Sequence, residues 1–277
     1  MSVMTKLPVL ASAGLLLVLG ASCTQPRMNC TTSHSNYAAK YTLKSGDPTS
    51  PCGSLPGDLL NMQTYFATGG LNGTPKFSEP SLAIRSDTSV YANLDPADYP
   101  VEIPGYMYDY NAASALGKFA GGVPDDNDFC TAKDMKPSVV AVPELPSYEE
   151  TPDDPMTPEN EQVIVPATPA TTMRHEWTVA RWLVSPDAQG TQFEGTVKVS
   201  IDGCSAEYDV LAVSPGVPCQ ADADCKDGSG INPSFAVTCD LDLELIEGDV
   251  ADDPETPEDE TANWGTCILK EALPAYE

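Results

Sequence analysis

The sequence predicts a mostly β protein, with disulfide-linked antiparallel sheets in a sandwich-like arrangement, long acidic proline-rich loops and little helix. Three observations support this fold class. Several segments alternate apolar and polar residues with a period of two, which is typical of half-buried strands. The chain of 277 residues contains 26 prolines and 20 glycines, which interrupt it too often for long helices. It also contains nine cysteines, many for a chain of this length.

The clearest element is a β-hairpin between Thr196 and Val213. Apolar side chains occupy every second position on both sides of the pair Asp202-Gly203. This pair tolerates positive φ and is typical of tight hairpin turns. We therefore expect two adjacent antiparallel strands here.

Other segments predict single elements with weaker patterns. Strands are expected at Glu176–Val184, Phe235–Leu243, Tyr37–Leu43 and Ser81–Arg85. The segment Gly57–Phe66 fits either a strand or a single helical stretch. Asn111–Ala120 is the best candidate for a helix, because it combines alanine and leucine and lacks proline.

The N-terminus is typical of a secretory signal peptide over residues 1–22. Lys6 precedes an apolar run of 13 residues from Leu7 to Leu19, which is too short for the ~20 residues of a membrane-spanning helix. The following residues, Gly20-Ala21-Ser22-Cys23, resemble the lipobox of bacterial lipoproteins, although leucine lies one position earlier than usual. The resemblance implies that Cys23 is acylated and becomes the new N-terminus. The alternative is ordinary cleavage nearby, with Cys23 as another disulfide partner.

Cysteine parity agrees with lipidation, because removing Cys23 leaves an even number. The eight others are Cys30, Cys52, Cys130, Cys204, Cys219, Cys225, Cys239 and Cys267. In an exported chain they predict up to four disulfides, with 105 possible connectivities that the sequence does not resolve. A zinc site is the alternative, but no C-x-x-C pair occurs.

Composition divides the mature chain into three regions, 23–141, 142–172 and 173–277. The central region carries seven prolines, seven acidic residues and no lysine or arginine, which is typical of a linker or a long loop. Residues 244–260 form a second acidic segment with nine acidic residues. The flanking regions are expected to be a β-rich N-terminal part and a disulfide-rich C-terminal part, as one domain or two.

The formal net charge of −27 becomes −28 on removal of residues 1–22, because only Lys6 is lost. This charge argues against nucleic acid or anionic lipid as a partner and permits divalent cations or basic proteins.

Few residues are candidates for catalysis. The two histidines, His34 and His175, lie in no H-E-x-x-H motif, and no G-x-S-x-G elbow is present. Both are expected to be structural or surface residues. Carboxylate pairs for glycoside hydrolysis cannot be selected among 41 acidic residues, because the separation they require is spatial.

Two further patterns suggest binding. Asp222, Asp224 and Asp227 form a weak calcium candidate, since an EF-hand would require ligands where Lys226 and Pro233 stand. No other cofactor is indicated. The tyrosine-rich run Tyr106–Tyr110 fits either a sugar or protein contact, or an extended segment with one face in the core.

The segment Pro218–Cys225, continued to Asp240, resembles the cysteine-rich C-terminal part of uncharacterised outer-membrane lipoproteins of myxobacteria and their relatives. This resemblance implies location and style of fold, but no activity. Thr24 is not the aspartate that retains lipoproteins in the inner membrane of enteric bacteria. We therefore expect a non-enzymatic, lipid-anchored envelope protein, periplasmic or surface-exposed, whose ligand is unknown. The alternatives are a secreted hydrolase of envelope or extracellular polymers and a divalent-cation-binding surface protein.

Overall fold

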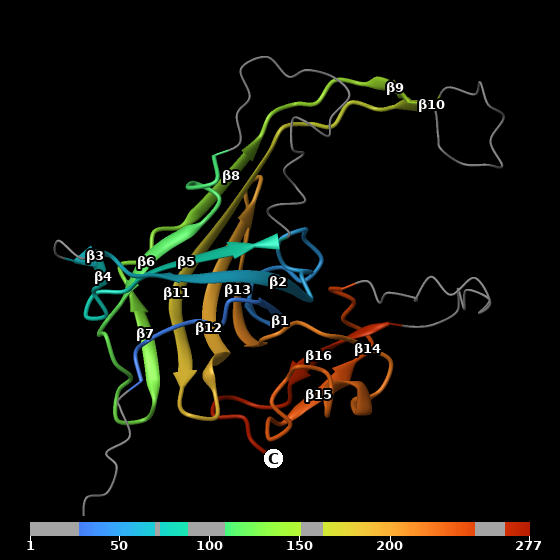
Figure 1. Cartoon of the computed structure of the whole chain (residues 1–277). Coiled ribbons are helices and arrows are strands. Elements are labelled where there is room, and N and C mark those ends of the chain that lie inside the picture. Colours follow the sequence, from blue (N-terminus) through green and yellow to red (C-terminus); the bar gives the residue numbers. More distant parts are fainter. Residues whose placement is uncertain (1–27, 70–72, 88–108, 151–162, 247–263) are drawn as a thin grey trace, which may run out of the picture.

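The computed structural model describes residues 28–69, 73–87, 109–150, 163–246 and 264–277 (Figure 1). The main sheet has nine strands, and eight of them form a ring. These eight are β1 (Asn36–Ser45), β2 (Gly57–Tyr65), β5 (Ser81–Ser86), β6 (Ala115–Phe119), β7 (Phe129–Lys133), β11 (Thr171–Val184), β12 (Gln189–Ile201) and β13 (Cys204–Val213). Each pairs antiparallel with the next in this order, and β13 pairs with β1. These eight strands therefore form one closed sheet.

The predicted mostly β, antiparallel and disulfide-linked fold is confirmed. The sheet faces that pack against each other are opposite walls of this closed sheet. Closure leaves β1 and β13 without free edges, because Ala38 pairs with Val213 and Ala39 with Ala212.

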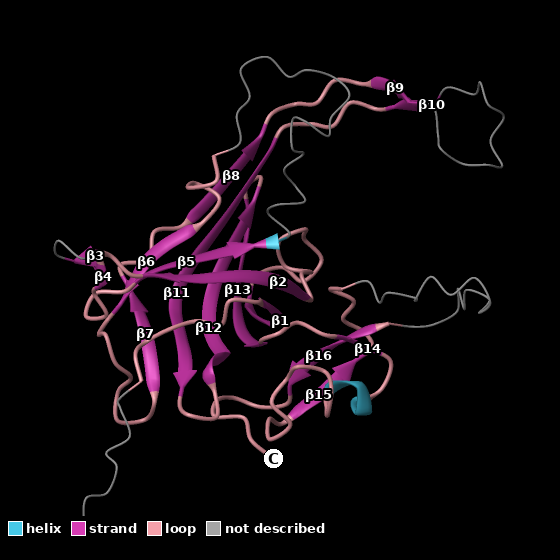
Figure 2. Ribbon diagram, in the orientation of Figure 1, coloured by secondary structure: helices cyan, strands magenta, loops and turns pink. Residues whose placement is uncertain are grey.

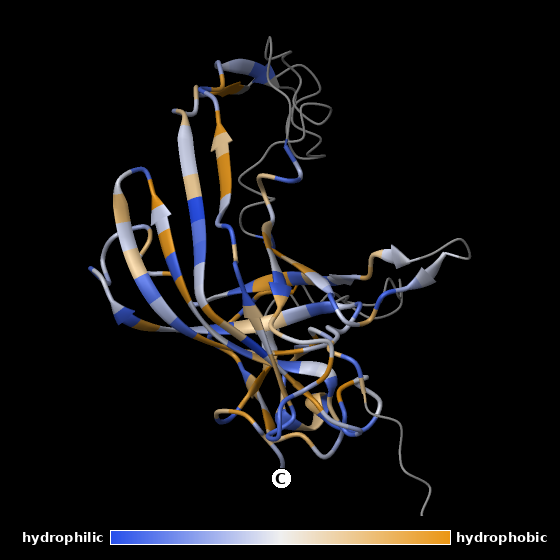
Figure 3. Cartoon of the chain, turned by 90° about the vertical axis from the view of Figure 1, so that its left-hand side faces the viewer, coloured by the Kyte–Doolittle hydropathy of each residue, from blue (hydrophilic) through white to orange (hydrophobic). Residues whose placement is uncertain are grey.

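Side chains fill the interior of the closed sheet. Along β1, Tyr37, Ala39 and Tyr41 belong to the main buried cluster, and all eight strands contribute to that cluster. Figure 3 shows hydrophobic and hydrophilic residues alternating along the strands. An eight-stranded closed sheet has an interior just wide enough for such side chains. The sequence pattern with period two thus corresponds to an inner and an outer face.

An arm extends from one end of the closed sheet. The first half of β11 pairs with β8 (Ser138–Val142) instead of β7, from Thr171 opposite Val142 to His175 opposite Ser138. Beyond this pairing lie two short paired strands, β9 (Tyr148–Glu150) and β10 (Val163–Val165) (Figure 1). The region 142–172 therefore connects two neighbouring strands of one sheet, as a loop. Regions 23–141 and 173–277 both contribute strands to the closed sheet.

A small C-terminal sheet packs outside the closed sheet. Its order is β14 (Pro218–Cys219), β16 (Gly265–Leu269) and β15 (Val237–Asp240), with a 3-10 turn η1 (Asp222–Cys225) beside it (Figure 2). Its buried residues form a cluster with Leu183 on β11, Val213 on β13 and Ala188 just before β12. A further pair of short strands, β3 (Thr68–Gly69) and β4 (Thr74–Pro75), forms a separate hairpin.

All eight predicted cysteines form disulfides, and the fold resolves their connectivity. The pairs are Cys30–Cys130, Cys52–Cys204, Cys219–Cys239 and Cys225–Cys267. The first joins the segment before β1 to β7, and the second joins the β1–β2 loop to the start of β13. The last two lie within the C-terminal sheet and η1. The sulfur atoms of Cys219, Cys225 and Cys267 lie within 4.8 Å of one another because these two disulfides are neighbours.

Most predicted strands are confirmed. The hairpin turns at Asp202-Gly203, where both residues have positive φ. Strands are present at Tyr37–Leu43, Ser81–Arg85 and Glu176–Val184, and the ambiguous segment Gly57–Phe66 is a strand. The strand predicted at Phe235–Leu243 is shorter, at Val237–Asp240.

The helix predicted over Asn111–Ala120 is wrong. Asp109 accepts hydrogen bonds from the backbone of Asn111 and Ala112, which fixes a turn. The chain then enters β6, whose Ala115 and Phe119 point into the buried cluster. Pairing with β5 and β7 outweighs the helical propensity of alanine and leucine.

Candidate functional site

The first described residues of the chain, from residue 28 onward, are fixed to the closed sheet. Cys30 is joined to Cys130 on β7, and its amide donates to the carbonyl of Gly122 at 3.0 Å. Two residues later, the amide of Thr32 donates to the Thr64 hydroxyl at 3.0 Å. The first described residues are therefore held in place by one covalent bond and several hydrogen bonds.

Gly190, at the start of β12, completes this attachment. Its carbonyl accepts hydrogen bonds from the Ser33 amide, at 3.1 Å, and from the Tyr37 hydroxyl. Gly190 has φ of +71°, and an added Cβ would lie 2.3 Å from the carbonyl oxygen of Thr31. Only glycine fits this approach, since a side chain would displace the N-terminal segment.

The attachment of the N-terminal segment, at the Cys30–Cys130 disulfide, and the arm lie toward opposite ends of β11. Cys130 pairs with Trp182, near the end of β11, whereas the arm joins at Thr171. Eleven residues of strand separate these positions, roughly 35 Å at ~3.3 Å per residue. Cys23 lies seven residues before Cys30, at most about 25 Å of extended chain. An anchor at Cys23 would therefore hold the Cys30–Cys130 end nearer the membrane than the arm.

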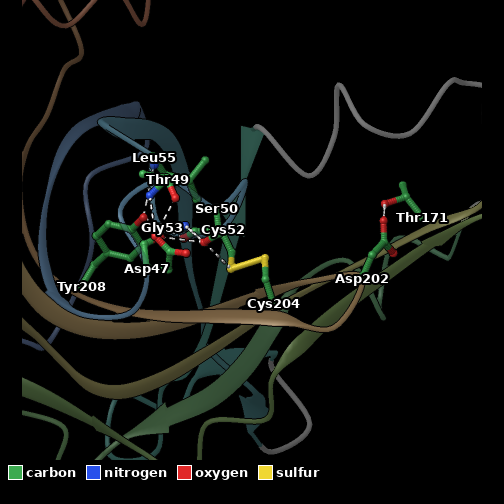
Figure 4. Close-up of a disulfide and its surroundings, with 10 residues drawn as sticks. All are labelled: Asp47, Thr49, Ser50, Cys52, Gly53, Leu55, Thr171, Asp202, Cys204 and Tyr208. Carbon is green, nitrogen blue, oxygen red and sulfur yellow. Dashed lines mark hydrogen bonds between the residues drawn. A yellow bond between two sulfur atoms is a disulfide. The ribbon is translucent and has the colours of Figure 1, made fainter.

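Figure 4 shows a second disulfide near the β12–β13 turn, together with the contact between this turn and the first residue of β11. Cys52 lies in the loop between β1 and β2 and is bonded to Cys204, directly after the β12–β13 turn. The Tyr208 hydroxyl donates to the Cys52 carbonyl at 2.7 Å and accepts from the Leu55 amide at 3.1 Å. In the turn itself, Asp202 accepts from the Thr171 hydroxyl and the Thr172 amide, which hold the pKa of its carboxyl below the usual range. Sequence reasoning identified the cysteines and the turn, but not Tyr208.

His175 is a buried residue of β11, with 2% of its surface exposed. It pairs with Val199 on β12 and with the buried Ser138 on β8. Burial lowers the pKa of His175 to about 4, because an imidazolium would lose its hydration. His175 is therefore uncharged at neutral pH and structural in position, as expected.

This pKa makes stability depend on pH between about 6.5 and 4. In that window the unfolded chain binds a proton at His175 and the folded chain does not. The stabilisation that the neutral His175 gives the folded state above pH 6.5 is therefore lost as the pH falls. We expect the free energy of unfolding to fall by about 2 to 3 kcal/mol more in the wild type than in His175→Gln between pH 7.5 and 4.5. Urea denaturation at both pH values measures this difference. In the matched variant His34→Gln, the free energy of unfolding should fall between the two pH values by as much as in the wild type. If it fell by the same amount in His175→Gln, His175 would not be the source of the pH dependence.

His34 lies on the surface and lines a shallow pocket of about 250 Å³ on the outer face of the closed sheet. Its Nδ1 is 3.2 Å from the amide nitrogen of Gln63. The other polar lining residues include Asn61 and Tyr65 on β2, Arg85 on β5, and Ser114. The sequence reasoning selected His34 but none of the other lining residues. The alternation Asn61, Gln63, Tyr65 on β2 is the signal that could have found them.

The three calcium candidates are not gathered into a site. Asp222 accepts hydrogen bonds from the Thr238 hydroxyl at 2.7 Å and the Cys239 amide at 2.8 Å, which lower the pKa of its carboxyl. Asp224 accepts from the amides of Gln220 and Ala221. Among the described residues, the side chains close enough together to bind one metal ion are Cys219, Cys225 and Cys267, which form disulfides. Asp222, Asp224 and Asp227 do not form such a group there. Asp222 and Asp224 thus stabilise the turn around η1.

Several predicted features lie outside the described residues. These are the signal peptide, Cys23, most of the acidic segment 244–260, and the tyrosine run up to Tyr108. Tyr110, at the end of that run, is described and is 62% exposed. Of the helices in the described residues, none has the length and apolar character needed to cross a membrane.

The structure defines a protein with a closed antiparallel sheet and four disulfides, whose described N-terminal segment begins a few residues after the lipobox-like cysteine. The family model for MlpA matches residues 35–215, which include most of the closed sheet. The chain therefore belongs to the MlpA family.

A curated relative supports the same classification along nearly the whole chain. The chain is 26% identical to the protein named "Putative lipoprotein MlpA" from Myxococcus xanthus, over 97% of this chain and 96% of the relative. The predicted resemblance to myxobacterial lipoproteins is thereby confirmed, and the chain is a lipoprotein of the cell envelope. No solved structure matches the chain.

Proposed function

We propose that the protein is anchored to the outer membrane through lipid on Cys23 and has a non-enzymatic binding or structural role. The observation that carries the proposal is the fixed segment at Cys30, seven residues after Cys23, which joins the closed sheet at one end. A lipid anchor of two or three acyl chains holds a protein stably, since one chain alone binds only marginally. The short connection would also orient the protein at the membrane.

In this orientation, the arm extends away from the bilayer. Residues 142–172 carry seven acidic residues and no basic residue, so this loop would attract basic partners and repel anionic lipid. Keeping it away from the membrane avoids that repulsion. The arm is therefore the part of the protein best placed to contact a partner.

The positions of the two histidines support a non-enzymatic role over a hydrolase. His175 is buried in the sheet and is not accessible to a substrate. His34 is accessible, but its described contact is the Gln63 amide. A serine or cysteine nucleophile requires an imidazole oriented by an acidic group.

The anchor is tested by replacing Cys23. We expect Cys23→Ser to move the protein from the membrane fraction to the soluble fraction, because no acyl chain can be attached through sulfur. The measurement is immunoblotting of fractionated cells, with Ser22→Ala as a control that leaves the cysteine in place. If Cys23→Ser remained in the membrane fraction to the same extent as the wild type, the proposal would be wrong.

A further inference from the structure

The pocket beside His34 lies on the outer face of the closed sheet because of how β2 and β5 pair. Asn61 is opposite Arg85, and Gln63 is opposite Ala83. These side chains share one face, while Met62 and Ile84 between them point into the buried core. The small side chain of Ala83 leaves a depression between larger neighbours. Its volume, about 250 Å³, suits a ligand of monosaccharide or amino-acid size.

Arg85 supplies a positive charge to this pocket. Its Nε is buried and forms no hydrogen bond with the residues that the structure describes. The ion pairs formed among those residues likewise leave out Arg85, although the chain has 41 acidic residues. A buried donor without a partner is costly, and a guanidinium is suited to pairing with a carboxylate.

Asp87, two residues further along the chain, does not neutralise Arg85. The pKa of the Asp87 carboxyl is raised by burial, and the opposing effect of the Arg85 charge is smaller. A carboxylate closely paired with the guanidinium would have a lowered pKa. Among the residues that the structure describes, Arg85 thus forms no ion pair with a carboxylate.

Apart from Met62 and Ala83, the other lining residues have polar side chains, and Tyr65 adds a phenol ring. Gln63, Asn61, Ser35 and Ser114 offer amide and hydroxyl groups that both donate and accept hydrogen bonds. Tyr65 is 55% exposed and presents an apolar ring surface with a polar tip. A sugar ring carries hydroxyl groups and also has faces of C–H bonds. It therefore matches this combination of polar groups and one aromatic ring better than an apolar ligand does.

We propose that this pocket binds a sugar acid, with the carboxylate on Arg85, the hydroxyl groups on the amide and hydroxyl side chains, and the sugar ring against Tyr65. The high negative charge of the chain opposes anions in general, so binding depends on the local charge of Arg85. The proposal is independent of the membrane anchor.

Isothermal titration calorimetry of the full chain in detergent, with D-glucuronate as the probe, tests this proposal. We expect saturable binding that weakens at least tenfold in Arg85→Gln. Binding should change less than twofold in the control Arg174→Gln, an arginine on the arm that pairs with Glu176. D-glucose, which lacks the carboxylate, and acetate, which lacks the ring, should each bind at least tenfold more weakly than D-glucuronate.

A second variant separates the roles of charge and ring. Tyr65→Ala, at an exposed position, should weaken D-glucuronate at least threefold and leave acetate unchanged. The proposal is overturned if D-glucuronate shows no saturable binding to the wild type up to roughly 20 mM, a range in which even very weak ligands bind. It is also overturned if D-glucuronate binds Arg85→Gln as tightly as it binds the wild type. Tighter binding of L-glutamate than of D-glucuronate would overturn the assignment to a sugar acid.

Discussion

Replacing Trp182 by alanine is expected to lower the free energy of unfolding by about 3 to 5 kcal/mol. Trp182 lies on β11 and is fully buried inside the closed sheet. Its ring contacts Phe193 on β12 with a centroid distance of 4.8 Å and Phe119 on β6 with 5.3 Å. Its indole N–H also lies 3.2 Å from the sulfur of Met62 on β2. One side chain therefore joins four strands around the interior.

The loss follows from the cavity that alanine would leave among these aromatic rings. Denaturation by guanidinium chloride with the disulfides intact measures the loss. Val179→Ala is the matched control, since Val179 lies on the same strand and is 45% exposed, and it should cost less than about 0.5 kcal/mol. A cost below about 1 kcal/mol for Trp182→Ala would mean that the interior is not packed around this ring.

Removing the Cys30–Cys130 disulfide is expected to cost about 2 to 5 kcal/mol of stability. The two cysteines are 100 residues apart, so the bond restricts a long segment of the unfolded chain. The double variant Cys30→Ala/Cys130→Ala removes the bond without leaving a free thiol. Urea denaturation compared with the wild type gives the change.

The same variant should loosen the N-terminal attachment. We expect faster hydrogen exchange at the amides of residue 30, which is alanine in the variant, and Thr32. The first amide donates to Gly122 and the second to Thr64, and both hydrogen bonds depend on the position of this segment. The double variant Cys219→Ala/Cys239→Ala is the control, because that disulfide lies in the C-terminal sheet. Exchange in residues 28–33 that is unchanged by loss of the Cys30–Cys130 bond would show that hydrogen bonds alone hold the segment.

Local patterns were sufficient to predict some of the strands, but β6, β7, β8 and β16 were not predicted. The alternation around Asp202-Gly203 predicted the β12–β13 hairpin because side-chain alternation and turn chemistry are both properties of neighbouring residues. Asn111–Ala120 misled for the same reason, since its composition favours a helix while its place between β5 and β7 requires a strand.

Closure of the sheet and the disulfide connectivity could not be predicted. The pairing of Ala38 with Val213 joins residues far apart in the chain, and no local pattern specifies it. Likewise, Asp222 looked like a metal ligand from the spacing of its neighbours, whereas its carboxylate binds the backbone of Cys239. The pocket at Arg85 was not predicted, because its residues come from separate segments that only the closed sheet brings together.

The central claim is that the mature chain begins at an acylated Cys23. Mass spectrometry of the N-terminal peptide, released by protease from protein purified out of the membrane fraction, tests this claim most directly. We expect a peptide that begins at Cys23 and carries the mass of a diacylglyceryl group on its sulfur. An unmodified peptide that begins at any other residue would contradict it.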